Sequence, residues 1–158
     1  MHKPDAEQAK QYISEIDFTM VKFKLTHATL GSGWSLGKAN RVEREYRNYL
    51  TLLLTQLTGD DVLLPPSHDV DEFWHNHILD TRAYVRDCSK IFGRYLHHFP
   101  YFGMRGEQDA LDLKKAFEKT SQGYKNLFGE ELKGRGRSIH SSEARVDPSS
   151  PTRSFVNL

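Results

Sequence analysis

The segment from residue 36 to residue 57 carries the hydrophobic pattern that most constrains the fold. Its apolar residues recur at steps of three and four, and they are Ala39, Val42, Tyr46, Tyr49, Leu50, Leu53, Leu54 and Leu57. Charged and polar residues from Arg41 to Asn48 occupy the opposite face. This period is typical of an amphipathic helix rather than a strand. We therefore predict a helix from about Leu36 to Leu57, with one face buried.

Other segments indicate further helices. Residues 5–27 place apolar side chains at helical steps, namely Ile13, Ile16, Met20 and Phe23, and predict one helix or two short ones. Residues 70–90 and 107–128 predict two more, the first capped by Ser67 or Asp69 and the second ended by Gly129. No alternating pattern favours a sheet. We predict an all-α fold, a compact bundle of about four to five helices.

Two segments between these helices are not expected to be regular. Residues 62–66 contain two consecutive prolines, which remove backbone donors, so they predict an extended arm. Residues 93–106 are rich in aromatic side chains and in glycine, and they predict an ordered aromatic loop that could include one helical turn.

The 158-residue chain suits one helical domain, residues 1–132, followed by a different kind of segment. Residues 133–158 are rich in Gly, Arg, Ser and Pro, and predict a disordered basic tail. The tail has five basic and two acidic side chains, which leaves a net charge of −2 on the rest. A protein partner could contact this tail. Nucleic-acid binding is not expected, because the domain lacks clustered Lys and Arg.

Cysteine content and hydropathy indicate the cellular compartment of the protein. The single cysteine, Cys88, excludes an intramolecular disulfide and fits a reducing compartment. No run of residues approaches the roughly 18 apolar positions that a membrane span needs. We expect a cytoplasmic protein without membrane contact.

Residues 70–106 hold four of the eight histidines and the only cysteine. On one regular helix from 70 to 90, His77 falls on the apolar stripe with Trp74, Tyr84, Val85 and Cys88. His75 lies about 160° away, on the side of Asp71. The two histidines cannot share one ion on such a helix. HNH nucleases take these residues from separate elements, so the letters His-Asn-His do not indicate that activity.

A composite metal site remains. Asp71 and His75 from the helix, with His97 or His98 from the aromatic loop, would supply two imidazoles and one carboxylate. This donor set suits zinc or non-haem iron and leaves positions open for water or substrate. The secondary candidates are His77, Cys88, Trp74 and Tyr84. No organic cofactor is predicted, and whether the protein is an enzyme stays open.

The alternative is that the histidines are hydrogen-bonded core residues. Aspartates at positions 71, 80 and 87 could accept their ring N–H groups. The protein would then be a non-catalytic interaction module whose tail contacts a partner. The sequence leaves both hypotheses open.

The order of several rare residues carries a family resemblance. They are Asp71, Trp74, His75, His77, Leu79, Tyr84, Asp87, Cys88, Gly93 and His97, together with the segments 33–35, 45–47 and 97–103. Over about residues 15–130 the chain resembles the glycine-rich domain-containing protein-like family, and in particular its short bacterial members. Plant members carry long glycine-rich regions, some with RNA-binding segments, which this chain does not have. The resemblance implies no catalytic residue.

Overall fold

The computed structural model describes residues 4–56, 63–134 and 136. These residues form six helices and no strand: α1 (Ala6–Glu15), α2 (Thr19–Thr26), α3 (Leu36–Gln56), α4 (His68–Leu79), α5 (Thr81–Phe92) and α6 (Glu107–Phe128). The all-α prediction is confirmed. There is one helix more than expected, because the segment predicted as a single helix from 70 to 90 forms α4 and α5. Most of the predicted tail lies outside the described residues, although Gly136 forms an isolated bridge with Ser67.

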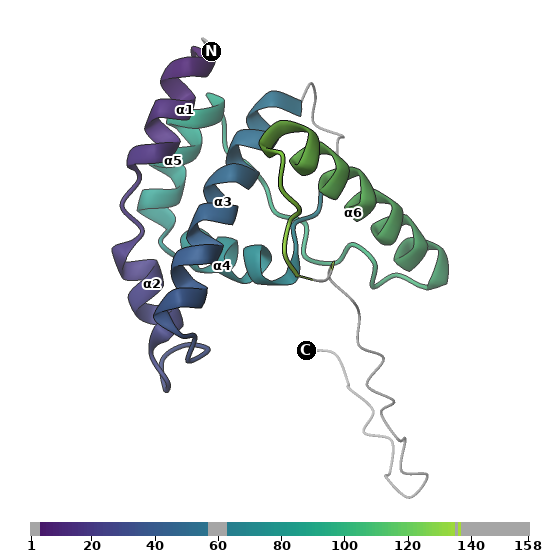
Figure 1. The fold of residues 1–158 in the computed structure, drawn as a ribbon, viewed down its shortest axis with the longest axis horizontal. Helices are drawn as coiled ribbons and strands as arrows, with labels where there is room; N and C mark the ends of the chain where they lie inside the picture. The colour runs from purple at the N-terminus through teal and green to yellow at the C-terminus, as the bar shows by residue number, and fades with distance from the viewer. Residues whose placement is uncertain (1–3, 57–62, 135, 137–158) are drawn as a thin grey trace, which may run out of the picture.

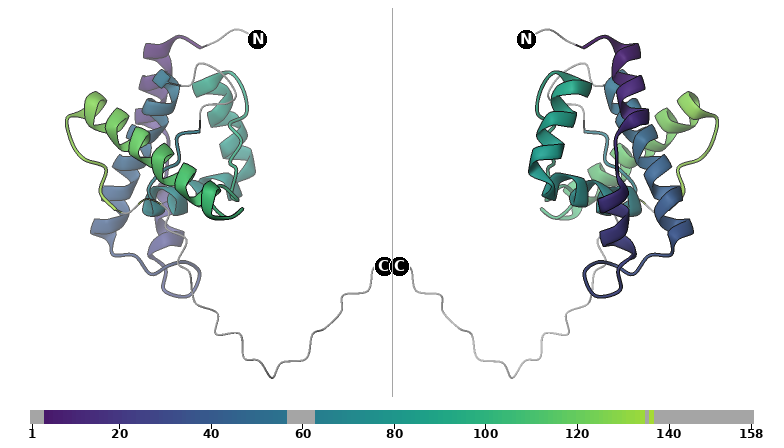
Figure 2. Two further views of the ribbon diagram at one scale, coloured as in Figure 1. Left: turned by 90° about the vertical axis from the view of Figure 1, so that its right-hand side faces the viewer. Right: turned by 90° about the vertical axis from the view of Figure 1, so that its left-hand side faces the viewer.

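Helix α3 is the centre of the bundle and packs against α1, α2, α4 and α6. Figures 1 and 2 show α1 and α2 following one another along one side of α3, with α6 on the other side. The predicted stripe is buried at Ala39, Val42, Tyr46, Tyr49, Leu50 and Leu53. Leu57 lies outside the described residues. Glu45, predicted on the polar face, is instead buried and paired with Arg41 at 2.9 Å.

The N-terminal segment, for which the sequence predicted either one helix or two short ones, forms two helices. Ile13 is buried as predicted, but Met20 is 70% exposed and Phe23 is 53% exposed, so their placement on the core face was wrong. The reason is a break between Glu15 and Thr19 that resets the helical phase. Phe18 and Leu25 occupy the core in their place.

The predicted third helix is also wrong as a single element, because it breaks at Asp80. That residue has φ −81° and ψ 74°, and its carboxylate accepts from the backbone N–H of Ala83 at 3.3 Å. It therefore ends α4 and caps α5. The helical wheel does not extend across this break, and Val85, expected on the apolar stripe, is 53% exposed. Ser67, one of the two predicted caps, begins α4 by accepting from Val70.

The break at Asp80 brings α5 back against α4 and joins His77 to Asp87. His77 Nε2 lies 3.0 Å from Asp87 Oδ2, and the Tyr46 hydroxyl lies 2.9 Å from His77 Nδ1. The pattern assigns the ring proton to Nε2, with Tyr46 donating to Nδ1. Tyr12 and Arg86 donate to the other Asp87 oxygen, at 2.7 and 2.9 Å. His77 is 3% exposed and holds helices together.

The same network sets the ionisation of Asp87. Burial opposes its charge, yet hydrogen bonds from His77, Tyr12 and Arg86 hold the pKa of Asp87 below its ordinary value of 3.8. The carboxylate is therefore ionised at neutral pH and satisfies three donors at once.

The aromatic loop begins after the left-handed Gly93 and ends where α6 begins. Its chain turns at residues 100–103, where the Met104 N–H donates to the Tyr101 carbonyl at 3.0 Å, and it contains no helical turn. Gly103 has φ +88°, and its N–H donates to Asp109 at 2.7 Å. A Cβ there would lie 2.4 Å from a Leu113 methyl carbon. Only glycine fits this close approach to α6.

None of the helices in the described part of the chain combines the length and the apolar character that a membrane crossing requires.

Replacing Asp87 tests the network between α4 and α5. We expect Asp87→Ala to lower the free energy of unfolding by about 2–4 kcal/mol at pH 7, because it leaves the N–H of His77 and the hydroxyl of Tyr12 without their buried acceptor. Urea unfolding followed by circular dichroism measures this. Asp112→Ala, at an exposed position on α6, is the control and should change stability by less than about 0.5 kcal/mol.

The pH dependence has a defined sign. The folded pKa of Asp87 is lowered, so its contribution is fully present above the unfolded value of 3.8 and is lost as pH falls through the folded pKa. The stability difference between wild type and Asp87→Ala should therefore narrow below about pH 4. A difference that stays constant down to pH 3 would contradict this account.

Replacing two of the glycines by alanine should change the stability of the protein in opposite directions. Gly103→Ala should destabilise the protein by at least about 2 kcal/mol, because a positive φ and a contact with Leu113 both oppose the new Cβ. Gly37→Ala, where a Cβ meets nothing within 4 Å, should stabilise α3 by about 0.5–1 kcal/mol. Thermal and urea unfolding of the two variants measure the difference. Equal effects would show that the loop accommodates a side chain at Gly103.

Candidate metal centre

Asp71, His75 and His98 converge on one point. His98 Nε2 lies 2.7 Å from Asp71 Oδ1, His75 Nε2 lies 3.1 Å from His98 Nε2, and His75 Nε2 lies 3.5 Å from Asp71 Oδ2. Among the described residues these three form the group of His, Cys, Asp and Glu side chains that could hold an ion, with ligand atoms within 4.8 Å of one another. The prediction left His97 and His98 as alternatives, and the geometry brings in His98.

One ring hydrogen on each imidazole does not turn all three contacts of this triangle into good hydrogen bonds. His98 Nε2 is close to both an Asp71 oxygen and the second imidazole nitrogen, but a neutral ring nitrogen carries one hydrogen or one lone pair. If His98 Nε2 donates to Asp71, it has no lone pair left for His75, and the His75 nitrogen must share the same hydrogen. If neither nitrogen carries a hydrogen, their two lone pairs face each other. A cation between the three atoms would use all the lone pairs at once.

The local fold explains why Asp71 and His75 share a face. They lie one turn apart on α4, whereas His77 lies two residues further and faces the core. The side chain of Asp71 is 8% exposed and that of His75 is 42% exposed. The candidate site therefore lies at the edge of the core, with His75 on its solvent side.

His98, the third residue of the triangle, lies in a loop that a relay of hydrogen bonds holds in place. Trp74 Nε1 donates to the Tyr84 hydroxyl at 3.0 Å, and that hydroxyl donates to the Leu96 carbonyl at 2.6 Å. Burial raises the pKa of Tyr84 far above its ordinary value of 10.0, so the hydroxyl remains a donor. The Trp74 ring also packs edge-on against His98, with centroids 4.5 Å apart. The relay fixes the backbone two residues before His98.

The remaining predicted site residues lie elsewhere. His97 is exposed and packs against Tyr95 with ring centroids 4.8 Å apart, outside the triangle. His77 belongs to the buried network with Asp87. Cys88 is 2% exposed, and burial raises the pKa of its thiol, which disfavours the reactive thiolate. Trp74 and Tyr84, also secondary candidates, act through the relay.

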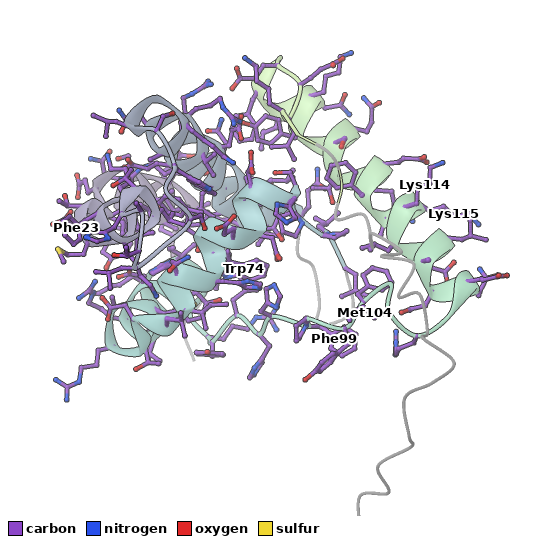
Figure 3. All side chains as sticks on the ribbon, turned by 90° about the horizontal axis from the view of Figure 1, so that it is seen from below. Phe23, Trp74, Phe99, Met104, Lys114 and Lys115 are labelled. Atoms are coloured by element: carbon purple, nitrogen blue, oxygen red, sulfur yellow. The ribbon has the colours of Figure 1, made fainter. Side chains whose placement is uncertain are left out.

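A cavity of about 110 Å³ adjoins the triangle. Asp71 and His98 form part of its wall, and the rest is mainly hydrocarbon from α3, the proline-containing arm, the aromatic loop and α6. Figure 3 shows Trp74 at the helices and Phe99 and Met104 along the loop that leads to α6, with Lys114 and Lys115 on the outer side of that helix. The cavity thus lies where these segments meet.

Sequence reasoning missed this cavity. Its wall includes Leu53, Leu64, Leu96, Phe102 and Leu113, which come from four separate segments. The apolar character of residues 62–66 was the available signal, because an arm with leucines next to prolines needs a surface to pack against. The position of α6 was not available from its sequence pattern.

Comparisons with known proteins agree with the resemblance seen in the sequence. The profile of the UCP032817-like family matches residues 8–153. Two curated proteins from Arabidopsis thaliana, glycine-rich domain-containing proteins 1 and 2, are 36% and 31% identical to the chain over 64 residues. Each match covers 40% of this chain and 8% of the relative. No solved structure matches the chain significantly.

The family match extends over nearly all of the helical bundle, from α1 through α6, and so includes the candidate metal residues. The predicted family resemblance is confirmed. The chain belongs to the UCP032817-like family, and it is related in sequence to glycine-rich domain-containing proteins.

Proposed function

We propose that this small helical protein binds a divalent transition metal ion through Asp71, His75 and His98. The observation that carries the proposal is the convergence of one carboxylate and two imidazoles. The imidazole nitrogens lie 3.1 Å from each other, and 2.7 and 3.5 Å from the two oxygens of Asp71. Ligands bound to one tetrahedral ion at about 2.0–2.2 Å lie about 3.3–3.6 Å apart, so small side-chain shifts bring all three into range.

Chemistry of the donors favours zinc or iron(II). Two neutral imidazoles and one carboxylate are ligands of intermediate softness, and three protein ligands leave at least one position open. Structural zinc sites are usually closed by four protein ligands. The open set favours an ion that binds an additional small molecule, which is the arrangement that metal-dependent enzymes use.

Support for preorganisation comes from the shell around these ligands. The relay from Trp74 through Tyr84 to Leu96 holds the loop, and the Trp74 ring limits where the His98 imidazole can lie. Such outer contacts orient metal ligands and increase affinity. They also reduce the conformational entropy that binding would otherwise cost.

Adjacent histidines provide a matched test of the ligand set. His98→Ala should abolish stoichiometric Zn²⁺ binding, whereas His97→Ala, at the exposed neighbouring position, should retain one ion per chain. Isothermal titration calorimetry and elemental analysis after dialysis measure this. Equal zinc content in wild type and His98→Ala would overturn the proposal.

Tyr84→Phe tests the relay without changing a ligand. It leaves the Trp74 N–H and the Leu96 carbonyl without a partner, which should cost about 1–3 kcal/mol of stability. Because the loop that carries His98 loosens, zinc affinity should fall about 10- to 100-fold while the stoichiometry remains one. Val85→Ala, at an exposed position on the same helix, is the control and should bind zinc as wild type does. Unchanged affinity in Tyr84→Phe would show that the relay does not position His98.

A further inference from the structure

We infer that the cavity beside the metal residues binds a small monoanion with a short apolar body, whose anionic group completes the coordination of the ion. This inference rests on the proposed metal site and specifies its ligand. It combines three properties of the molecule: the position of the cavity, the chemistry of its wall and the charge of the ligand set.

The position of the cavity connects it to the ion. Asp71 and His98 are common to the triangle and to the cavity wall, whereas His75 belongs to the triangle alone. A molecule in the cavity therefore reaches the ion from the side that Asp71 and His98 border. This is where a position left open by three protein ligands could be filled from inside the protein.

The chemistry of the wall favours an apolar body. Apart from the metal residues, three polar side chains line the cavity. The Tyr49 hydroxyl donates to the Leu64 carbonyl at 2.7 Å, Trp74 Nε1 donates to Tyr84 at 3.0 Å, and the third is the imidazole of the exposed His97. Burial raises the pKa of Tyr49 well above its ordinary value, so it remains a donor. The hydrocarbon of Leu53, Leu64 and Leu113 then makes up much of the remaining surface.

Charge favours an anion. A divalent ion with one carboxylate and two neutral imidazoles has a net charge of +1, and a single negative group neutralises it. In a largely apolar cavity an uncompensated charge is costly, so the neutral assembly is favoured over one with a neutral ligand.

Size sets the chemical class. A cavity of 110 Å³ is somewhat smaller than the roughly 150 Å³ that holds benzene. It suits a ligand of about six non-hydrogen atoms, such as a four-carbon carboxylate. Dicarboxylates, sugars and nucleotides are disfavoured, because most of the wall is hydrocarbon and offers few partners for additional polar groups.

Butyrate and its neutral isostere butyramide test the inference on the full chain. The protein is first titrated with Zn²⁺ or Co²⁺ to establish one ion per chain, and the loaded protein is then titrated with each probe by calorimetry. Butyrate should bind at least tenfold more tightly than butyramide. It should also change the visible absorption of the Co²⁺ form, because an added ligand alters the coordination of the ion.

Variants of Leu113, on the α6 side of the cavity, separate the cavity from the metal ligands. Leu113→Phe should retain one zinc ion and lose butyrate affinity at least tenfold, because the larger ring fills the space. Leu113→Ala should retain zinc and bind hexanoate more tightly than wild type does. Circular dichroism checks that each variant folds. If one of the two variants does not fold, the other is sufficient for the test.

The outcomes distinguish the two proposals. If the wild-type protein does not bind zinc, both the proposed metal site and this inference are overturned. Stoichiometric zinc without butyrate binding, or butyrate binding that Leu113→Phe and Leu113→Ala leave unchanged, overturns the inference and leaves the metal site intact. Equal affinity for butyrate and butyramide contradicts the requirement for an anion.

Discussion

The hydrogen bond from the Tyr84 hydroxyl to the Leu96 carbonyl is the contact on which the site depends. The loop that carries His98 has no regular secondary structure, so its backbone must be held by side chains from the bundle. Tyr84 supplies that hold at 2.6 Å, and its other partner, Trp74, lies on the helix that carries Asp71 and His75. One buried hydroxyl therefore links three segments: α4, α5 and the loop. Its burial keeps it protonated and makes the link insensitive to pH over the physiological range.

Tyr84 can occupy this position because the chain breaks at Asp80. A straight helix would carry Tyr84 and Asp87 away from α4, whereas the break returns α5 to pack against α4 and α1. The network of His77 and Asp87 then joins the two helices in the core, and Tyr46 connects it to α3. The two histidines separated by one residue thus have different roles: His77 stabilises the turn-back that His75 and His98 need in order to meet.

Much of the fold could be predicted from residue patterns, and the errors have local causes. The stripe on α3 and the divergence of His75 from His77 follow from helical periodicity, and the end of α6 at Gly129 follows from the preference for glycine after a helix; all three are observed. The predicted phase of α2 and the single helix from 70 to 90 were wrong. A change in the direction of the chain leaves little trace in the hydrophobic pattern, because it depends on which surfaces pack together. An aspartate at position 80 is compatible with a helix interior and with a cap, and contact between α4 and α5 selects the cap.

The sequence by itself determined that the protein is helical, that α3 has a buried face, and that Asp71 and His75 lie together on one side of a helix, because each of these depends on spacing within a few residues. Only the tertiary structure decided that His98 rather than His97 meets them, and that a cavity adjoins the three. Those features depend on how a loop 23 residues beyond His75 is held against the bundle. No local spacing encodes the distance between His75 and His98, because the turn at Asp80 and the relay through Tyr84 set it.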